Sequence, residues 1–385
     1  MVEWKHLKDV CNILNGYSFK STFYKAEGYR VIRISDVQSG YISNENMVFY
    51  PIELKGEYQK HILKEKDLVM SLTGNPGRVA MIKAKDLPCA LNQRVACLRP
   101  LDINVSFLFY LFNNPEFEII AFSNSTGGAQ KNLSTTWLGN YKIPIPSLSE
   151  QNRIVSILDT FTDSIENLKH QIEQRRKQYE YYRDDLLELK DITGVILTTL
   201  GEIGTFIRGT GIQKADFVDN GFPCIHYGQI HTKYGISATE TISFVNEKLY
   251  KKSKKASKGD VILATTSEDA EGVAKPVAWL GDEDVAISGD AYVFHHEQNG
   301  KYMAHLFASH RFFLFKIKHA TGTKVTRISG ESMAKFELAL PDIDLQNRIV
   351  AILDKFEASI DNLEKQLVQR QKQYEYYRNK LLTFE

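Results

Sequence analysis

Apolar residues recur at alternating steps of four and three residues along two stretches of the chain, 154–186 and 349–381. This alternation places them in one stripe along a helix, as a coiled coil requires. The stripe positions are Ile154, Leu158, Phe161, Ile165, Leu168, Ile172, Arg175, Tyr179, Tyr182 and Leu186, then Ile349, Leu353, Phe356, Ile360, Leu363, Leu367, Arg370, Tyr374, Tyr377 and Leu381. With its flanking residues, each stretch predicts a helix of roughly 40 residues, which is about 60 Å long at a rise of 1.5 Å per residue. We expect the two stripes to pair with each other; the alternative is that each helix packs only on its own globular domain.

The two helical stretches are copies of one sequence. From Gln151 and from Gln346, 25 of 37 aligned residues are identical, at an offset of 195 in a chain of 385. The chain is therefore a duplication of one unit, and such a repeat is stronger evidence about the fold than any short motif. Arg175 and Arg370 are the charged stripe residues and occupy the same place in both copies, where a polar residue can fix the register of a helix pair. A capping box at 147–150 and a cap at Asp344 are expected to begin the helices.

The segments before the helices match only loosely. Thr126-Gly127 parallels Thr321-Gly322, while the residues between such anchors differ strongly. Runs of β-branched and aromatic residues predict strands at 29–34 and 261–265, and helices are expected at 105–111 and 302–315. The predicted fold class is mixed α/β: two globular domains alternate with two long paired helices. The expected boundaries are 1–148 and 191–343 for the globular domains and 149–190 and 344–385 for the helices.

Composition is that of an ordinary globular protein, with 43% hydrophobic and 25% charged residues. No run of 18 apolar residues predicts a membrane span, and the N-terminus has no apolar signal core. Cys11, Cys89, Cys97 and Cys224 are scattered, which indicates free thiols in a reducing cytoplasm and neither a disulfide framework nor a zinc site.

The charge balance limits unaided nucleic-acid binding. The net charge is +1, and the largest regional basic excess is 17 Lys and Arg against 13 Asp and Glu over residues 1–149. A free-standing DNA-binding protein usually carries a larger basic excess. If this chain binds DNA, its charge is locally clustered or a partner supplies phosphate contacts.

Catalytic motifs are missing from the sequence. There is no phosphate-binding GxxxxGK[ST] loop, no strand followed by GxGxxG, and no HExxH metal motif. Asn114-Pro115-Glu116-Phe117 has some similarity to the catalytic loop of amino-methyltransferases but lacks its second proline. We therefore expect no enzymatic activity in this chain.

The repeated QNRIV helices that end in QYEYYR, the Leu-x-[Asp/Glu]-[Val/Ile] opening of each half, and the stretch 221–230 together resemble the specificity (S) subunit of Type I restriction-modification systems. The resemblance implies that each globular domain is a target recognition domain for double-stranded DNA and that the helices form an antiparallel spacer. It implies assembly with two modification subunits, which hold S-adenosylmethionine and methylate adenine, while this chain binds no cofactor. Two restriction subunits can join such a complex.

Candidate base-reading residues are polar side chains in predicted loops, because Arg, Asn and Gln make bidentate contacts with bases and Lys contacts phosphates. They are Asn75, Arg78, Asn92, Gln93, Arg94, Lys131 and Asn132 in the first globular domain, and His226, Tyr227, Gln229, Ser267, Lys324 and Arg327 in the second. The alternative at each position is a solvated or capping side chain. Tyr181 and Tyr376 lie off the stripe and are candidates for contact with a partner subunit.

Two other classes of function fit parts of the pattern. One is a stand-alone regulator that binds split operators, which the near-neutral charge disfavours because unaided binding depends on phosphate neutralisation. The other is a scaffold that joins two protein ligands through a coiled coil.

Overall fold

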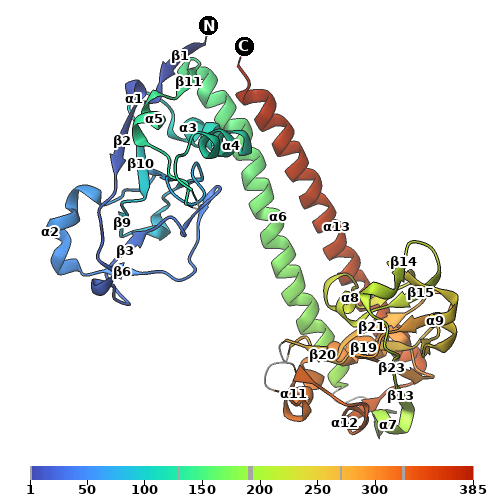
Figure 1. Ribbon diagram of the computed structural model, residues 1–385. Coiled ribbons are helices and arrows are strands. Elements are labelled where there is room, and N and C mark those ends of the chain that lie inside the picture. Colours follow the sequence, from blue (N-terminus) through green and yellow to red (C-terminus); the bar gives the residue numbers. More distant parts are fainter. Residues whose placement is uncertain (1, 129, 190–193, 269–270, 323–325, 385) are drawn as a thin grey trace. The chain divides into compact units, whose positions relative to one another are not determined.

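Figure 1 shows the computed structural model, which describes residues 2–384 except 129, 190–193, 269–270 and 323–325. The chain forms two compact units: residues 1–167 with 367–385, and residues 168–366. Each unit holds one sheet-rich globule, the beginning of the long helix that follows it, and the end of the other long helix. This confirms the predicted mixed α/β fold.

The first globule begins and ends with short strands, β1 and β11, that pair antiparallel with each other. Its elements are β1 (Glu3–His6), α1 (Leu7–Val10), β2 (Cys11–Asn15), η1 (Ser21–Phe23), β3 (Tyr29–Ile32), β4 (Val37–Gln38), β5 (Tyr41–Ile42), β6 (Phe49–Tyr50), η2 (Ile52–Leu54), α2 (Lys55–Tyr58), η3 (Gln59–His61), β7 (Leu68–Ser71), β8 (Val79–Met81), η4 (Ala84–Asp86), β9 (Cys89–Leu91), β10 (Val95–Pro100), α3 (Val105–Phe112), α4 (Pro115–Ser123), α5 (Thr135–Asn140) and β11 (Lys142–Ile145). The long helix α6 (Leu148–Glu188) follows.

The second globule repeats this order. Its elements are β12 (Ile196–Thr199), α7 (Leu200–Ile203), β13 (Gly204–Arg208), η5 (Lys214–Asp216), β14 (Phe217–Val218), β15 (Phe222–Ile225), α8 (Tyr227–Thr232), β16 (Ser237–Ala238), β17 (Ser243–Val245), α9 (Glu247–Lys252), β18 (Lys255–Ala256), β19 (Val261–Ala264), β20 (Thr266–Ser267), β21 (Lys275–Trp279), β22 (Val285–Ile287), β23 (Ala291–His296), α10 (Gly300–Ala308), α11 (His310–His319), β24 (Thr326–Arg327), α12 (Gly330–Ala334) and β25 (Glu337–Leu340). The long helix α13 (Ile343–Leu382) follows.

The two globules share one sheet arrangement despite their different sequences. The first has sheets in the order β2-β10-β7-β8 and β6-β3-β9, and the second has β13-β23-β19-β21-β16 and β14-β17-β15-β22-β18. In the first globule, β10 pairs antiparallel with β2 and with β7, and every residue of β7 is buried. In the second globule, β23 pairs antiparallel with β13 and with the fully buried strand β19. Each second sheet contains one parallel pair, β3–β9 or β15–β22. The loops that follow these strands therefore lie at equivalent places in the two globules.

Each globule's largest core includes residues of both long helices. In the first unit, Ile154, Val155 and Leu158 of α6 join the core, and Tyr374 and Leu381 of α13 pack against it. In the second unit, α13 contributes its N-terminal turns and α6 its last turns, through Ile349, Val350, Leu353, Leu187 and Tyr179. Burial of apolar area, at about 25 cal/mol per Å², thus holds each globule to the helices.

The antiparallel pairing of α6 and α13 is confirmed by two equivalent ring stacks. Phe161 stacks on Tyr377 at 5.2 Å between ring centroids, and Tyr182 stacks on Phe356 at 5.4 Å. The repeat offset of 195 exchanges the members of one stack with those of the other.

The charged stripe residues lie against these same stacks. The guanidinium of Arg370 is 5.7 Å from the Phe161 ring centroid, and that of Arg175 is 6.0 Å from the Phe356 ring centroid. A guanidinium over an aromatic face is attracted by the ring quadrupole. The arginines therefore combine a charge with the aromatic packing of the helix pair.

Two local predictions are corrected by the structure. Asp344 does not cap α13: Asp342 does, since its carboxylate accepts the N–H of Leu345 at 2.7 Å, and Asp344 lies in the first turn. The expected helix at 302–315 is two helices, because Ser309 takes an extended conformation and its hydroxyl accepts the N–H of Phe312 at 3.2 Å. A serine can satisfy backbone groups outside a helix and so favours such breaks.

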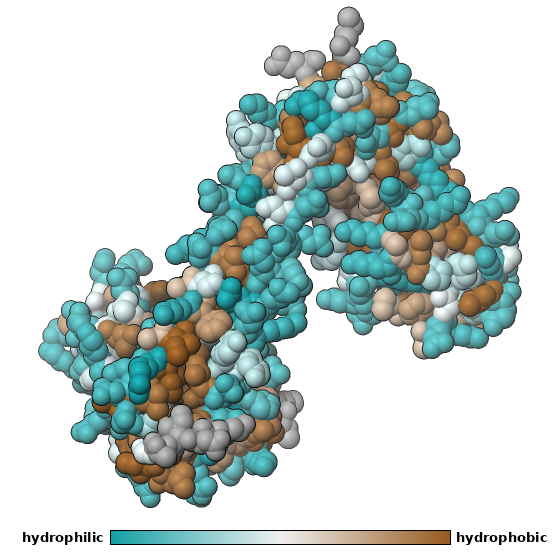
Figure 2. All heavy atoms as spheres, turned by 180° about the vertical axis from the view of Figure 1, so that it is seen from behind, coloured by the Kyte–Doolittle hydropathy of each residue, from teal (hydrophilic) through white to brown (hydrophobic). Residues whose placement is uncertain are grey.

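The visible surface is mainly hydrophilic, with hydrophobic patches on both globules (Figure 2). Trp4 and Leu197, on the N-terminal strand of each globule, are among the exposed apolar side chains. Within the described residues, no helix is long and apolar enough to cross a membrane. The four cysteines are buried free thiols, and burial raises the pKa of Cys11, Cys89 and Cys224 to about 12.

Candidate nucleic-acid interface

The first turn of each long helix is fastened to its globule by a buried glutamine. The Gln151 side chain accepts the N–H of Asn104 at 2.9 Å and donates to the Pro146 carbonyl at 2.9 Å. Gln346 accepts the N–H of Asn299 at 3.0 Å and donates to the Pro341 carbonyl at 2.9 Å.

The next residue of the repeat adds an exposed hydrogen bond in each half. Asn152 accepts from the Asn104 side chain at 2.8 Å, and Asn347 accepts from the Asn299 side chain at 2.7 Å. The Gln-Asn pair of the repeat is therefore an attachment point for the globule, which explains why both halves carry it.

Three loops of the first globule converge on one face. The loop after β7 joins the turn between β9 and β10, since the Leu72 N–H donates to the Arg94 carbonyl at 3.0 Å. It also joins the loop before α5, because the Gly74 N–H donates to the Lys131 carbonyl at 3.0 Å and the Thr73 hydroxyl donates to the Asn132 side chain at 3.0 Å. Most of the candidate readers of this globule are thereby brought together.

The converging loops differ in how free their side chains are. Asn75, Gln93, Arg94 and Asn132 are exposed, and Asn92 is half-buried. Lys131 is half-buried with its ammonium 5.5 Å from the centroid of the Phe122 ring. Asn75, Gln93 and Arg94 can bind a ligand without breaking these loop contacts, whereas the Asn132 side chain already accepts a hydrogen bond from Thr73.

Arg78 is held inside its globule. Its side chain is 31% exposed, donates to the Gln38 side chain at 2.9 Å, and lies 4.0 Å from the Glu118 carboxylate. These contacts favour a role for Arg78 in positioning the loop.

The second globule builds the same face from equivalent backbone contacts. The Thr265 N–H donates to the Asp290 carbonyl at 3.0 Å, as Leu72 does to Arg94. The N–H and carbonyl groups of Thr321 and Arg327 pair at 2.8 Å, as those of Thr126 and Asn132 do at 2.8 and 3.0 Å. The Thr-Gly anchors seen in the sequence therefore mark one structural position, and Arg327 occupies the place of Asn132.

Candidate residues of the second globule meet around Asp290. Ser267 and Arg327 lie on the short paired strands β20 and β24, beside Thr266, whose hydroxyl donates to the Asp290 carboxylate at 3.2 Å. His226 and Tyr227 line a hollow of about 390 Å³ together with Lys214, Ser288 and Asp290. Lys324 lies outside the described residues.

His226 is buried, and its surroundings favour the neutral form of the imidazole. Burial, followed by the charge of Lys214, lowers its pKa below the ordinary 6.5. Its Nδ1 accepts the N–H of Gly228 at 3.2 Å, which leaves Nε2 as the protonated ring nitrogen. The imidazole therefore offers one donor and no charge.

Gln229 has both ends of its side-chain amide engaged. It accepts the N–H of His226 at 3.1 Å and donates to the Ser243 hydroxyl at 2.5 Å. Gln229 thus shapes the turn that carries His226 and Tyr227, and a direct base contact would cost these two hydrogen bonds.

Arg208 belongs to this face and is missing from the sequence-derived candidates. It ends β13, and its Nε donates to the carbonyl of Gly289 at 2.9 Å. One of its terminal nitrogens lies 3.9 Å from the Asp290 carboxylate, and its side chain is 64% exposed. Sequence alone gave no signal for it, because the contact depends on a turn 81 residues away.

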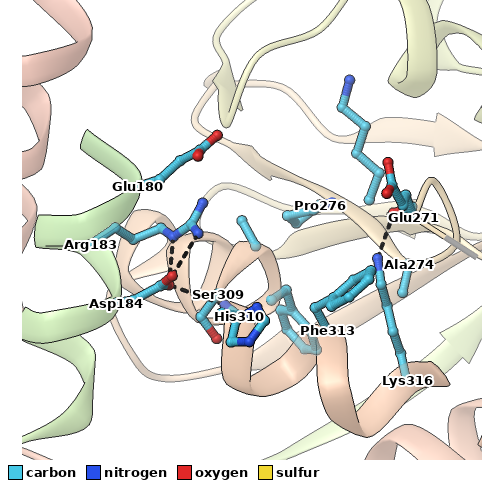
Figure 3. Close-up of a pocket in the computed structure, with 13 residues that line it drawn as sticks. Glu180, Arg183, Asp184, Glu271, Ala274, Pro276, Ser309, His310, Phe313 and Lys316 are labelled. Atoms are coloured by element: carbon cyan, nitrogen blue, oxygen red, sulfur yellow. Dashed lines mark hydrogen bonds and ion pairs between the residues drawn. The ribbon is translucent and has the colours of Figure 1, made fainter. Parts of the chain in front are cut away.

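A second hollow, of about 430 Å³, lies between the end of α6 and the α10–α11 corner of the second globule (Figure 3). Asp184, which pairs with Arg183 at 3.0 Å, accepts the N–H of His310 at 3.1 Å. Lys316 donates to the carbonyls of Glu271 and Val273 at 2.6 and 2.8 Å. Lys316 therefore holds Glu271 and Val273 against α11.

Tyr181 and Tyr376 project from the helices away from the stripe. They are 66% and 60% exposed, and each makes an edge contact with the next tyrosine, at 5.4 and 5.3 Å between centroids. Exposed aromatic side chains at equivalent places on two helices are suited to contact with another protein.

No cluster of His, Cys, Asp or Glu that could hold a metal ion occurs among the described residues. The family profile for the "Type I restriction modification DNA specificity domain" matches residues 1–175 and again 196–370. The chain belongs to the Type I restriction-modification specificity (S) subunit family. It is a non-catalytic DNA specificity subunit with two target recognition domains, as the resemblance implied.

Curated relatives agree with this assignment. The chain is 31% identical over 265 residues to the EcoR124I/EcoR124II specificity subunit of Escherichia coli. This alignment covers 64% of this chain and 65% of the relative. It is 26% identical over 407 residues to the Haemophilus influenzae protein S.HindORF215P, assigned as a type I restriction enzyme specificity subunit, covering 100% of this chain and 96% of the relative.

Solved structures share the fold. The crystal structure of the S subunit from M. genitalium aligns with a TM-score of 0.57 at 16% identity, over 100% of this chain and 97% of that one. A chain from a study of complex assembly and conformational transition of the type I restriction-modification system aligns with a TM-score of 0.60 at 16% identity, over 99% and 97%.

Proposed function

We propose that each target recognition domain reads one half of a bipartite, asymmetric DNA target, and that the paired helices set the gap and dock two adenine methyltransferase subunits. The observation that carries the proposal is the duplicated face: the same backbone contacts present Arg94 and Asn132 in one globule, and Asp290 and Arg327 in the other. A constant scaffold with different side chains is suited to reading two different sequences.

The exposed polar residues of each face are the proposed readers. In the first domain Asn75, Asn92, Gln93, Arg94 and Asn132 face solvent at least in part, with Lys131 beside them as a phosphate contact. Base specificity comes from bidentate contacts by Arg, Asn and Gln.

In the second domain, we assign reading to Tyr227, Ser267 and Arg327, with His226 as a neutral donor. Arg78 and Gln229 act through the loops that they hold. Lys324 stays a candidate phosphate contact.

Docking of the partners follows the repeat. Two equivalent helices with the exposed pair Tyr181 and Tyr376 present the same surface twice, so two identical subunits can bind in equivalent ways. The near-neutral charge supports a division of labour in which the methyltransferase subunits supply phosphate contacts and hold S-adenosylmethionine. Family membership favours this proposal over a stand-alone regulator or a protein scaffold.

The assembly is tested by co-expressing the chain with a candidate adenine methyltransferase subunit. Mass measurement is expected to give two methyltransferase subunits per chain, and DNA binding at physiological salt is expected to be tight for the complex and weak for the chain alone. A one-to-one complex as the sole assembly, or nanomolar DNA binding by the isolated chain, would contradict the proposal.

A further inference from the structure

The turn between the two sheets is the same structural position in both globules. In the first domain it is 92–94, in the second 288–290, and each forms a parallel bridge with the residue after a glycine: Tyr17 with Asn92, and Thr210 with Ser288. A Cβ on either glycine, Gly16 or Gly209, would come within 2.0 or 2.1 Å of the turn's backbone oxygen. Close backbone approach therefore fixes the turn identically in the two domains.

The charge at the end of this turn is reversed between the domains. Arg94 of the first domain is exposed, while the equivalent Asp290 of the second is acidic and accepts a hydrogen bond from Thr266. The last residue of the strand beside the turn differs in the opposite direction: the first domain has the uncharged Asn15, and the second has Arg208 at the equivalent position.

In each domain, an arginine therefore lies on this turn or on the strand beside it. In the first it comes from the turn itself, as Arg94. In the second it comes from the neighbouring strand, as Arg208, which the Gly289 carbonyl holds at 2.9 Å and which lies 3.9 Å from the Asp290 carboxylate.

We infer that Arg208 is a base-reading residue of the second domain, positioned by the 289–290 turn to recognise a guanine in the second half-site; this inference rests on the proposed function. Fixing Nε to a carbonyl orients the planar guanidinium before binding, and the side chain is still 64% exposed although one terminal nitrogen lies near Asp290. A pre-oriented guanidinium matches the paired acceptors O6 and N7 of guanine. A lysine or a freely rotating arginine would suit a phosphate instead.

The test compares Arg208→Ala, Arg208→Lys and Arg311→Ala in the full chain, co-expressed with the methyltransferase and read by methylome sequencing. Arg311 is the matched control, because it is also exposed on the second globule and donates to a backbone carbonyl, that of Glu337 at 2.9 Å, but lies on α11. Arg208→Ala is expected to relax one guanine position of the second half-site and to slow methylation of the intact target about 10- to 100-fold. Arg208→Lys is expected to relax the same position, since lysine cannot reproduce the fork.

The first half-site is the internal reference. An unchanged first half-site with a relaxed second one supports the inference, and the Arg311→Ala motif is expected to match the parent. If the Arg208→Lys complex keeps the full guanine requirement and the parental methylation rate, Arg208 contacts a phosphate and the inference is overturned. An unchanged motif in Arg208→Ala would also overturn the inference. Loss of any bipartite motif in the parent complex would instead count against the proposed function itself.

Discussion

At the scale of single residues, the two domains use one backbone frame to display different side chains. Asn132 and Arg327 make the same pair of backbone hydrogen bonds with Thr126 and Thr321, yet only one of them carries a charge. Because this frame is made of backbone groups, the Arg327 side chain can change without loss of the fold, whereas the Asn132 side chain also accepts a hydrogen bond from the Thr73 hydroxyl. We therefore expect substitution of Arg327 to alter DNA reading and leave stability within about 0.5 kcal/mol, as at most surface positions.

Arg94→Ala and Arg327→Ala are expected to weaken recognition of different half-sites. Loss of a bidentate base contact should cost about 1–3 kcal/mol and relax one base position. Methylome sequencing and methylation rates on the intact target check this, with Arg153→Ala as the control, because that exposed arginine lies on α6 and pairs with Glu150. An unchanged motif and rate in both variants would exclude these loops as readers.

Much of this face could be predicted from sequence, because loop polarity and the Thr-Gly anchors survive in both halves. Loop polarity predicts Asn92, Gln93, Arg94, Lys131 and Asn132 as readers, and the structure brings their loops onto one face, while their contact with DNA stays a prediction. What could not be predicted depends on contacts across the sheet, as with Arg208 on the 288–290 turn. Nor could sequence distinguish exposed side chains from those whose polar groups are already bonded inside the globule.

At the scale of elements, the long helices were predictable because their period is unbroken over about 40 residues. The first residue of each helix was less predictable, since Asp342 and Asp344 are equally suitable N-cap residues by type. The helix begins at Ile343, so Asp342 is the residue that caps it. The attachment of each globule to its helix was also hidden. Gln151 and Gln346 look like polar surface residues, yet they are 2% and 0% exposed.

Gln346→Ala is expected to destabilise the protein more than the neighbouring Asn347→Ala. The first change removes the partner of the half-buried Asn299 N–H and of the buried Pro341 carbonyl, at about 1–3 kcal/mol. Asn347 makes an exposed side-chain hydrogen bond, so its loss should cost less than about 1 kcal/mol. Urea unfolding of the full chain measures both, and equal losses would show that the glutamine is not the main attachment.

At the scale of the whole molecule, the repeat makes each half complementary to itself. One half contains Phe161 and Tyr182, and the intact chain stacks each on the equivalent of the other, Tyr377 and Phe356. Two copies of one half can therefore form both stacks. Two different recognition domains on one such frame are the basis of the asymmetric target that we propose for this chain.

A fragment that ends near residue 190 is accordingly expected to form a dimer, measurable by light scattering. Tyr182→Ala should weaken the dimer at least about tenfold, because it removes both stacked rings, each worth about 0.5–1.5 kcal/mol beyond its buried area. Tyr181→Ala is the matched control, since that ring lies off the stripe and the dimer should persist. A monomeric parent fragment, or equal weakening by both changes, would show that the stripe does not pair as described.

The central claim is that two different domains read the two halves of one target. Methylome sequencing of cells that express the intact chain with its adenine methyltransferase tests it most directly. We expect one asymmetric motif made of two short half-sites, separated by a fixed number of unread bases and centred roughly one DNA turn apart. A continuous motif, or a palindrome with identical halves, would contradict the account.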